Sequence, residues 1–296
     1  MTVYVFDGTM DGLLTAVFDS FALHEQPETV LTEGDALPLF CERIYTVHTD
    51  EEKARRVWTG LEKHLSREAM KLISVSWMSE LQELNGHLFR YICKVFTPPL
   101  TPPLKGAGNA YGTEDRQAKR AGNAYGTEVH QAKRAGNGCG IERNFADPDV
   151  LAVTNIARKV LHEQLRMKQF IRFQKAKDGT YLGVVSPDHN VLPLVIDHFH
   201  DRFNDQPWLI YDAKRHYGYH YDGNQVIRIT FEDEQAVPFN LSNGKLDESI
   251  LSSDDQLLQE LWRTYFKAIC IRERLNPRKQ LNDMPRRYWK YMTEKN

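Results

Sequence analysis

The C-terminal segment from Arg263 to Asn296 combines the residue types that bind nucleic acids. It contains ten lysines and arginines but three acidic residues, in a chain with a formal net charge of -2. Basic side chains neutralise phosphates, and aromatic rings stack on unpaired bases. A packed terminal helix with rings in the core and arginines near helix carbonyls is the alternative. The candidate nucleic-acid contacts in this segment are Arg272, Arg274, Arg286, Arg287, Trp289 and Lys290. Alanine at both 286 and 287 is expected to lower DNA affinity with little change in melting temperature.

A second basic and aromatic run, DAKRHYGYHYD, covers residues 212–222. On a strand, His216 and His220 would share one face. Basic and aromatic residues that alternate on a sheet are typical of a nucleic-acid platform, which the alternating segment KQFIRFQK could extend. A solvated hairpin with half-buried tyrosines explains the same pattern. The candidates here are Lys214, Arg215, His216, Lys168 and Arg172.

Two carboxylates, Asp7 and Asp11, lie in the turn FDGTMDG, between an expected strand and an expected helix. Acids in this position can act in catalysis or bind magnesium. However, the glycines do not follow the spacing of a phosphate-binding loop, and two acids would repel a phosphate. Thr9 as helix N-cap and Asp11 in the first turn account for the pattern without catalysis. Asp7 and Asp11 are the catalytic candidates of the sequence.

Other chemical signatures are missing from the sequence. Five histidines fall within residues 189–220, but without HExxH or a comparable ligand spacing, so we expect no metal site and no cofactor. The four cysteines are far apart and lack CxxC spacing, which argues against a zinc ribbon or a disulfide framework. Serine-hydrolase and kinase motifs are also absent. Whether the protein is an enzyme is left open.

Composition indicates an ordinary globular protein. With 296 residues and 41% hydrophobic content, the chain can bury a large core. The near-neutral net charge excludes a uniformly basic surface, so any nucleic-acid surface must be a local patch. We find no signal peptide and no run of about 18 apolar residues. We therefore expect a cytoplasmic protein without a membrane partner.

The first third of the chain is expected to be mostly helical. A strand at 2–7 precedes a helix at 10–24, and a strand at 42–47 precedes a helix at 50–64. One or two helices follow over 67–96, with a possible break near Asn85 and Gly86.

Residues 97–144 differ in kind. A 14-residue repeat begins at Ala107, Ala121 and Ala135, and it is rich in Gly, Ala, Asn and charge. The copies have no apolar stripe and cannot offset the entropy of ordering, so we expect a disordered insertion. A functional basic linker is the alternative.

The remaining residues predict an α+β fold, an antiparallel sheet meander with helices packed around it. Expected helices cover 147–166, 191–203 and 257–274, and expected strands cover 168–175, 181–185, 208–211, 217–221 and 226–231. We expect one domain over 1–296, interrupted by the repeat.

Three stretches carry a resemblance to a known family: the opening YVFDGTMDGLL, the central run RMKQFIRFQKAKDGTYLGVVSPDHNVLPLVIDHFHDRFNDQPWLIYDAKRHYGYHYDG and the ending RERLNPRKQLNDMPRRYW. The chain, apart from 97–144, resembles the bacterial family of DNA-metabolism proteins assigned to domain of unknown function 4130. The resemblance implies a DNA-related role beside a radical S-adenosylmethionine (radical SAM) protein of DNA repair. It also implies kinship with modules that some species fuse to a uracil-DNA glycosylase. Because this chain lacks the three-cysteine cluster of an iron–sulfur centre, it resembles the partner and not the radical enzyme.

Three hypotheses follow. The first is an accessory protein that binds DNA, single-stranded or damaged, and assists the radical SAM enzyme. The second is a nuclease or glycosylase-like hydrolase in its own right. The third is a protein-interaction adaptor that does not bind DNA.

Overall fold

The computed structural model describes residues 1–97, 140–231, 238–240, 243–247, 249–269 and 271–295. The predicted disorder of the repeat therefore concerns residues that lie mostly outside the described ones. Gly140–Arg143 forms a short 3-10 helix, η1. The chain divides into two compact units. Unit 1 comprises Met1–Lys71 and Asn85–Leu151, and unit 2 comprises Leu72–Leu84 and Ala152–Asn296.

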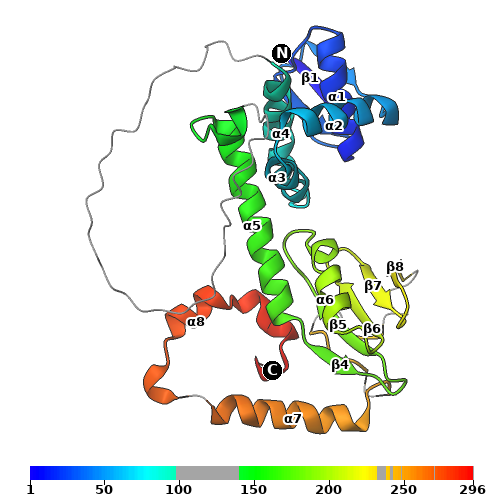
Figure 1. The fold of residues 1–296 in the computed structure, drawn as a ribbon, viewed down its shortest axis with the longest axis vertical. Coiled ribbons are helices and arrows are strands. Elements are labelled where there is room, and N and C mark those ends of the chain that lie inside the picture. Colours follow the sequence, from blue (N-terminus) through cyan, green and yellow to red (C-terminus); the bar gives the residue numbers. More distant parts are fainter. Residues whose placement is uncertain (98–139, 232–237, 241–242, 248, 270, 296) are drawn as a thin grey trace. The chain divides into compact units, whose positions relative to one another are not determined.

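Unit 1 contains a three-stranded parallel sheet in the order β2-β1-β3 (Figure 1). The strands are β1 (Thr2–Phe6), β2 (Thr29–Thr32) and β3 (Arg43–Thr46). β1 pairs with both neighbours in parallel. The sequence predicted β1 and β3 but missed β2, because its four residues, TVLT, show too short an alternation to stand out.

The helices in residues 1–97 are α1 (Met10–Ala22), α2 (Glu51–His64), α3 (Arg67–Trp77) and α4 (Gln82–Phe96). The end of α3 and the first residues of α4 belong to unit 2. The break between α3 and α4 lies at residues 78–81, not near Asn85 and Gly86. Glu80 adopts a left-handed backbone there (φ 56°), whereas Gly86 is accommodated inside α4. Glycine inside a helix costs only about 1 kcal/mol and does not by itself end it.

The start of α5 (Pro148–Phe170) is fastened to α4 within unit 1 by the buried carboxylate of Asp149. Burial opposes ionisation of this group. Hydrogen bonds from Arg90, Lys94 and His87 nevertheless lower its pKa to about 2. The predicted helix start, with proline in the first turn, is confirmed.

Unit 2 is built on a five-stranded sheet in the order β4-β5-β6-β7-β8 (Figure 1). Its strands are β4 (Phe173–Lys175), β5 (Tyr181–Val185), β6 (Trp208–Asp212), β7 (Tyr217–Tyr221) and β8 (Val226–Ile229). All neighbours are antiparallel except β5 and β6, which are parallel. The mixed α+β class is confirmed. The all-antiparallel meander is wrong at β5 and β6, because a crossover through η2 (Leu192–Leu194) and α6 (Ile196–Arg202) joins them.

The segment KQFIRFQK is not one strand. α5 continues through Lys168 to Phe170, and β4 begins only at Phe173. The segment alternates, but its first half also continues the helical period of the preceding residues, since Ile171 is buried four residues after the buried Met167. Lys168 is therefore on a helix and Arg172 in a loop, so they do not extend a sheet platform.

The C-terminal region consists of short elements after α7 (Ser253–Ala268). They are η4 (Arg272–Arg274), α8 (Pro277–Asp283), η5 (Arg286–Tyr291) and η6 (Thr293–Lys295). The predicted helix end at residue 274 is wrong, because α7 ends at Ala268. Pro277 instead starts α8, and the side chain of Asn276 accepts the N–H of Lys279 as its N-cap.

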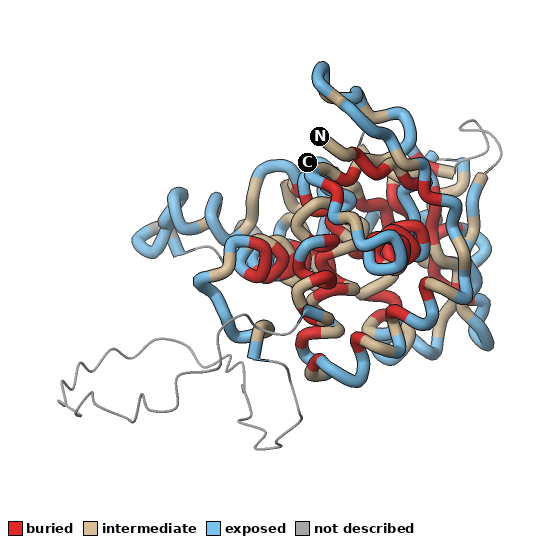
Figure 2. The backbone as a smooth tube through the Cα atoms, turned by 90° about the horizontal axis from the view of Figure 1, so that it is seen from above, coloured by how far each residue is buried: buried red, intermediate tan, exposed pale blue. Residues whose placement is uncertain are grey.

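β6 is buried along its whole length and forms the centre of unit 2. Elsewhere buried and exposed positions alternate, as the red and pale blue parts of the backbone tube in Figure 2 show. Tyr288 and Met292 are buried, so the C-terminal segment is anchored to the unit 2 core. In the described part of the chain, no helix is long and apolar enough to cross a membrane.

Candidate functional site

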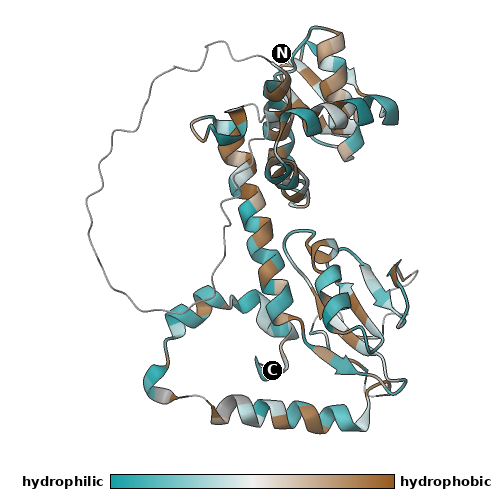
Figure 3. Ribbon diagram, in the orientation of Figure 1, coloured by the Kyte–Doolittle hydropathy of each residue, from teal (hydrophilic) through white to brown (hydrophobic). Residues whose placement is uncertain are grey.

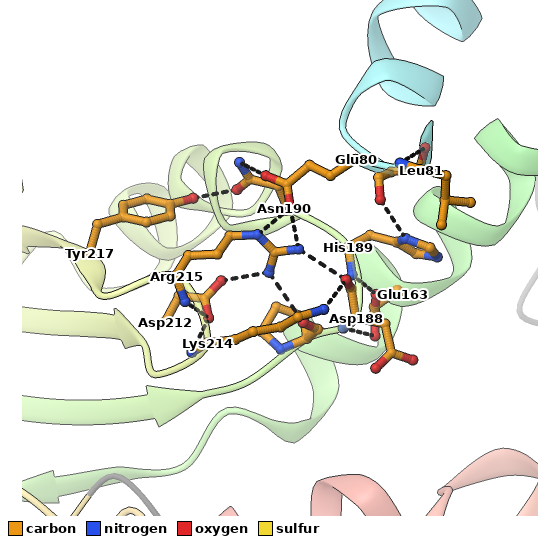
Figure 4. Close-up of polar contacts among 12 residues, drawn as sticks. Glu80, Leu81, Glu163, Asp188, His189, Asn190, Asp212, Lys214, Arg215 and Tyr217 are labelled. Carbon is orange, nitrogen blue, oxygen red and sulfur yellow. Dashed lines mark hydrogen bonds and ion pairs between the residues drawn. The ribbon is translucent and has the colours of Figure 1, made fainter. Parts of the chain in front are cut away.

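The most highly organised polar cluster of unit 2 lies where β5 and β6 end. The loop 186–190 follows β5, and the turn 213–216 follows β6 (Figure 4). Because these two strands are parallel, both loops emerge at the same edge of the sheet, the usual place for ligands in such sheets. Glu80 joins them from the connection between α3 and α4.

Arg215 holds this cluster together. Its guanidinium donates to Glu80 at 2.7 Å and Asp212 at 3.0 Å, and to the carbonyl oxygens of Pro187 at 3.2 Å and Asp188 at 2.9 Å. The side chain is 11% exposed. With its donors committed inside the fold, Arg215 positions the loop 186–190.

Asp212 is fully buried at the end of β6. Burial raises its pKa, although the N–H groups of Lys214 and Arg215 and the Arg215 guanidinium favour the ionised form. The Lys214 ammonium donates to the carbonyl of Asp188 at 2.8 Å. Lys214 and Arg215 therefore belong to a tight turn whose groups face the neighbouring loop.

His216 occupies the same turn with a left-handed backbone (φ 55°), and Glu80 across the cluster has φ 56°. Two of the three non-glycine residues with positive φ in the described chain thus lie at this site. Such conformations cost about 1–3 kcal/mol and gather at functional positions. The expectation that His216 and His220 share a strand face is wrong, because β7 begins only at Tyr217.

A second buried acid, Glu163 on α5, secures the loop from the other side. Its carboxylate accepts the backbone N–H groups of Asp188 (3.0 Å) and His189 (2.8 Å), the Arg287 guanidinium (2.8 Å) and the Tyr288 hydroxyl (2.8 Å). Burial is the main cause that raises the pKa of Tyr288 to about 12. Arg287 also pairs with the Asp188 carboxylate. Arg287 therefore connects the C-terminal segment to the loop.

Arg172 has a similar structural task. It donates to Glu294 at 2.6 Å, and that carboxylate is 1% exposed. Sequence reasoning counted Arg172, Arg215 and Arg287 as candidate DNA contacts and missed the buried acids opposite them. For Glu163 a signal existed: it lies three residues after Val160 and four before Met167, on the apolar face of a helix.

The other residues of η5 present a different surface. Trp289 is partly exposed, and its indole N–H donates to the carbonyl of Met284 at 3.0 Å. The Arg286 guanidinium lies 5.9 Å and the Lys295 ammonium 4.7 Å from the centre of its ring. Arg286 and Lys290 are exposed. Within the described residues no carboxylate pairs with Arg286.

Two further candidates lie in the short helices before η5. The backbone of Arg272 and Arg274 forms η4, and Arg274 is exposed.

Asp7 and Asp11 lie in unit 1, at the start of α1. The Asp7 carboxylate accepts the N–H and hydroxyl of Thr9 and the hydroxyl of Thr49. Burial opposes ionisation of Asp7, but these hydrogen bonds prevail and lower its pKa. Thr9 accepts the N–H of Gly12, which confirms it as the N-cap. Within the described residues no three His, Cys, Asp or Glu side chains are grouped as a metal site would need.

Comparison with known proteins places most of unit 2 in a family. No curated protein and no solved structure matches the chain. The model of a domain of unknown function, DUF4130, matches residues 124–294. The opening YVFDGTMDGLL precedes the matched residues, so its part in the resemblance stays a prediction. Since the match covers more than half of the chain, the protein belongs to the DUF4130 family.

Proposed function

We propose that the protein is a DNA-binding accessory factor in DNA repair or modification that works with a radical SAM enzyme. The observation that carries the proposal is the surface of η5, where the partly exposed ring of Trp289 is flanked by Arg286 and Lys295. A ring between cations can stack on an unpaired base while the cations contact the adjacent phosphates.

The attachment of η5 to the core of unit 2 supports this role. Tyr288 and Met292 are buried on either side of Trp289, and Tyr288 is bonded to Glu163. A side chain held by a packed element loses little freedom when a ligand binds, which favours affinity. We therefore expect single-stranded DNA, whose bases are accessible, to bind more tightly than duplex.

The adaptor hypothesis has one observation in its favour. The exposed apolar residues of α7 and the turn after it are Leu257, Leu258, Leu261, Trp262, Tyr265 and Ile269, each 41–60% exposed. Such a patch is typical of a protein interface. It is compatible with DNA binding, since the proposed accessory factor must also contact its enzyme. The hydrolase hypothesis lacks comparable support, because the Asp7 carboxylate holds the N-cap residue Thr9 and the hydroxyl of Thr49.

Fluorescence anisotropy with labelled single-stranded and duplex DNA tests the proposal. Trp289→Ala should weaken single-strand binding by the worth of one stacked base, about 1–3 kcal/mol or roughly 5- to 150-fold. Arg286→Ala should weaken both DNA forms and reduce the salt dependence.

Arg228→Ala is the matched control. This exposed arginine also lies over an aromatic ring, Tyr217, at 4.5 Å, but on β8. It should bind DNA like the wild type. Absence of wild-type binding to either DNA at low salt would refute the DNA role and leave the adaptor function, for which co-purification with the radical SAM protein is the test.

A further inference from the structure

The solvent face of α5 in unit 2 carries positive charge without exposed acids. Between Ala152 and Phe170 its basic residues are Arg158, Lys159, His162, Arg166 and Lys168. The one acid in this stretch, Glu163, is buried and bound to Arg287 and Tyr288. Figure 3 shows the helix as alternating hydrophilic and hydrophobic bands. All charged residues on the exposed side of α5 between Ala152 and Phe170 are therefore positive, beside the uncharged Asn155, Leu165 and Gln169.

Helix geometry aligns these charges. Residues 158, 162 and 166 are four apart, which places them on one side of the helix. At 1.5 Å rise per residue, Arg158 and Arg166 are about 12 Å apart along the axis. Arg158, Lys159 and His162 are exposed and Arg166 is half-buried, whereas Val160 and Met167 face the core. The cations thus form a track of two helical turns.

Nothing in the described part of the chain neutralises this track. Arg158, Lys159, Arg166 and Lys168 form no ion pair with any described carboxylate. The Arg166 guanidinium donates at 3.4 Å to the carbonyl of Asn282, in α8.

The C-terminal end of the α5 track lies close to α6, which carries the exposed acids Asp197 and Asp201 as well as Arg202. The side chain of Gln164 donates at 2.6 Å to the carbonyl of Leu194, which brings α5 against the start of α6. One turn further along each helix lie Lys168 and His198. Burial is the largest cause that lowers the pKa of His198, and the charges of Lys168 and Arg202 lower it further, against a smaller opposite effect of Asp201.

We infer that the exposed face of α5, with Arg158, Lys159 and Arg166 as principal contacts, binds the phosphates of a DNA backbone. This inference rests on the proposed function and adds a second contact surface to it. One DNA strand carries a phosphate about every 3.4 Å along the axis, so a 12 Å track faces roughly three or four phosphates. The basic residues recognise backbone charge, so this face contributes affinity without base preference.

The test compares two triple variants of the full chain. Arg158→Gln/Lys159→Gln/Arg166→Gln removes three charges from α5. Arg55→Gln/Lys63→Gln/Lys71→Gln removes three exposed charges from α2 and α3 of unit 1 and keeps the net charge equal. Binding is measured by anisotropy over a range of salt concentrations, and circular dichroism checks the fold of each variant.

The α5 variant should lower the slope of log affinity against log salt by roughly two to three and weaken binding more than tenfold at moderate salt. The control variant should stay within about twofold of the wild type. If the α5 variant matches the control while the wild type binds DNA and Arg286→Ala weakens that binding, the α5 inference is overturned and the proposed function stands. If the wild type binds no DNA, both fall.

Discussion

Replacement of Arg287 by alanine should destabilise the protein, whereas replacement of its neighbour Arg286 should chiefly affect DNA binding. Removing one partner of a fully buried ion pair costs about 3–5 kcal/mol. The Arg287 side chain is 41% exposed, so solvent already screens the pair, and Glu163 retains its other hydrogen bonds. We therefore expect a loss of about 2 kcal/mol, or roughly 4–8 °C in melting temperature.

Arg286 differs because its side chain is exposed. Among the described residues, its side chain contacts the Trp289 ring and no carboxylate. An exposed cation–π contact contributes about 0.5–1 kcal/mol, so Arg286→Ala should shift the melting temperature by no more than about 4 °C. From the sequence we expected an almost unchanged melting temperature after alanine substitution at either position. The structure leaves this prediction in place for Arg286 and replaces it for Arg287 by a clear decrease.

Calorimetry and urea unfolding measure the loss of unfolding free energy in Arg287→Ala. A double-mutant cycle with Glu163 shows how much of that loss comes from the Arg287–Glu163 pair. In the Glu163→Gln background the carboxylate charge is gone, so Arg287→Ala should cost at least about 1 kcal/mol less than in the wild type. Hydrogen exchange of the Asp188 and His189 amides should accelerate in Arg287→Ala, since Glu163 holds both. An Arg287→Ala protein that melts like the wild type and shows no coupling to Glu163 would refute the assigned anchoring role.

Three other predictions concern stability. Since the pKa of Asp149, about 2, lies below the ordinary value of 3.8, its ionised form stabilises the fold above pH 4 and this contribution disappears between pH 4 and 2. The difference in unfolding free energy between wild type and Asp149→Asn, about 2 kcal/mol at pH 6, should therefore vanish near pH 2 in urea titrations; a constant difference would contradict it. Gly218→Ala should cost about 1–3 kcal/mol in thermal melts, because its Cβ would lie 2.5 Å from a backbone oxygen of Ile210, while Gly140→Ala, with open space around it, should be neutral. Thr9→Ala should cost about 1 kcal/mol through loss of the α1 cap, and Thr9→Ser should restore it; equal urea midpoints for both would exclude the cap as the cause.

Local patterns predicted many elements of the fold. β1, α1, α2, β5 and β7 follow from short-range periodicity and turn residues, and their observed ends lie within two residues of the predicted ones. The secondary-structure prediction was wrong where helical and strand patterns overlap, as in KQFIRFQK. It missed β2, because a strand of four residues is too short to show a period. The direction of β6 relative to β5 is not encoded in either strand alone, because it depends on the crossover between them.

The sequence by itself identified the residues rich in charge and rings, including the block around Arg286 and Trp289. Only the tertiary structure showed which of these cations anchor the fold and which remain exposed, because that depends on whether a carboxylate lies within ion-pair distance. Arg172 and Arg287 face buried carboxylates from segments distant in the chain, and Arg215 faces the buried carboxylate of Asp212 three residues before it. In contrast, Arg286 and the cations of α5 face no described carboxylate. Burial strengthens a charge pair and solvent weakens it, so the same residue type anchors the fold in one place and remains available to a phosphate in another.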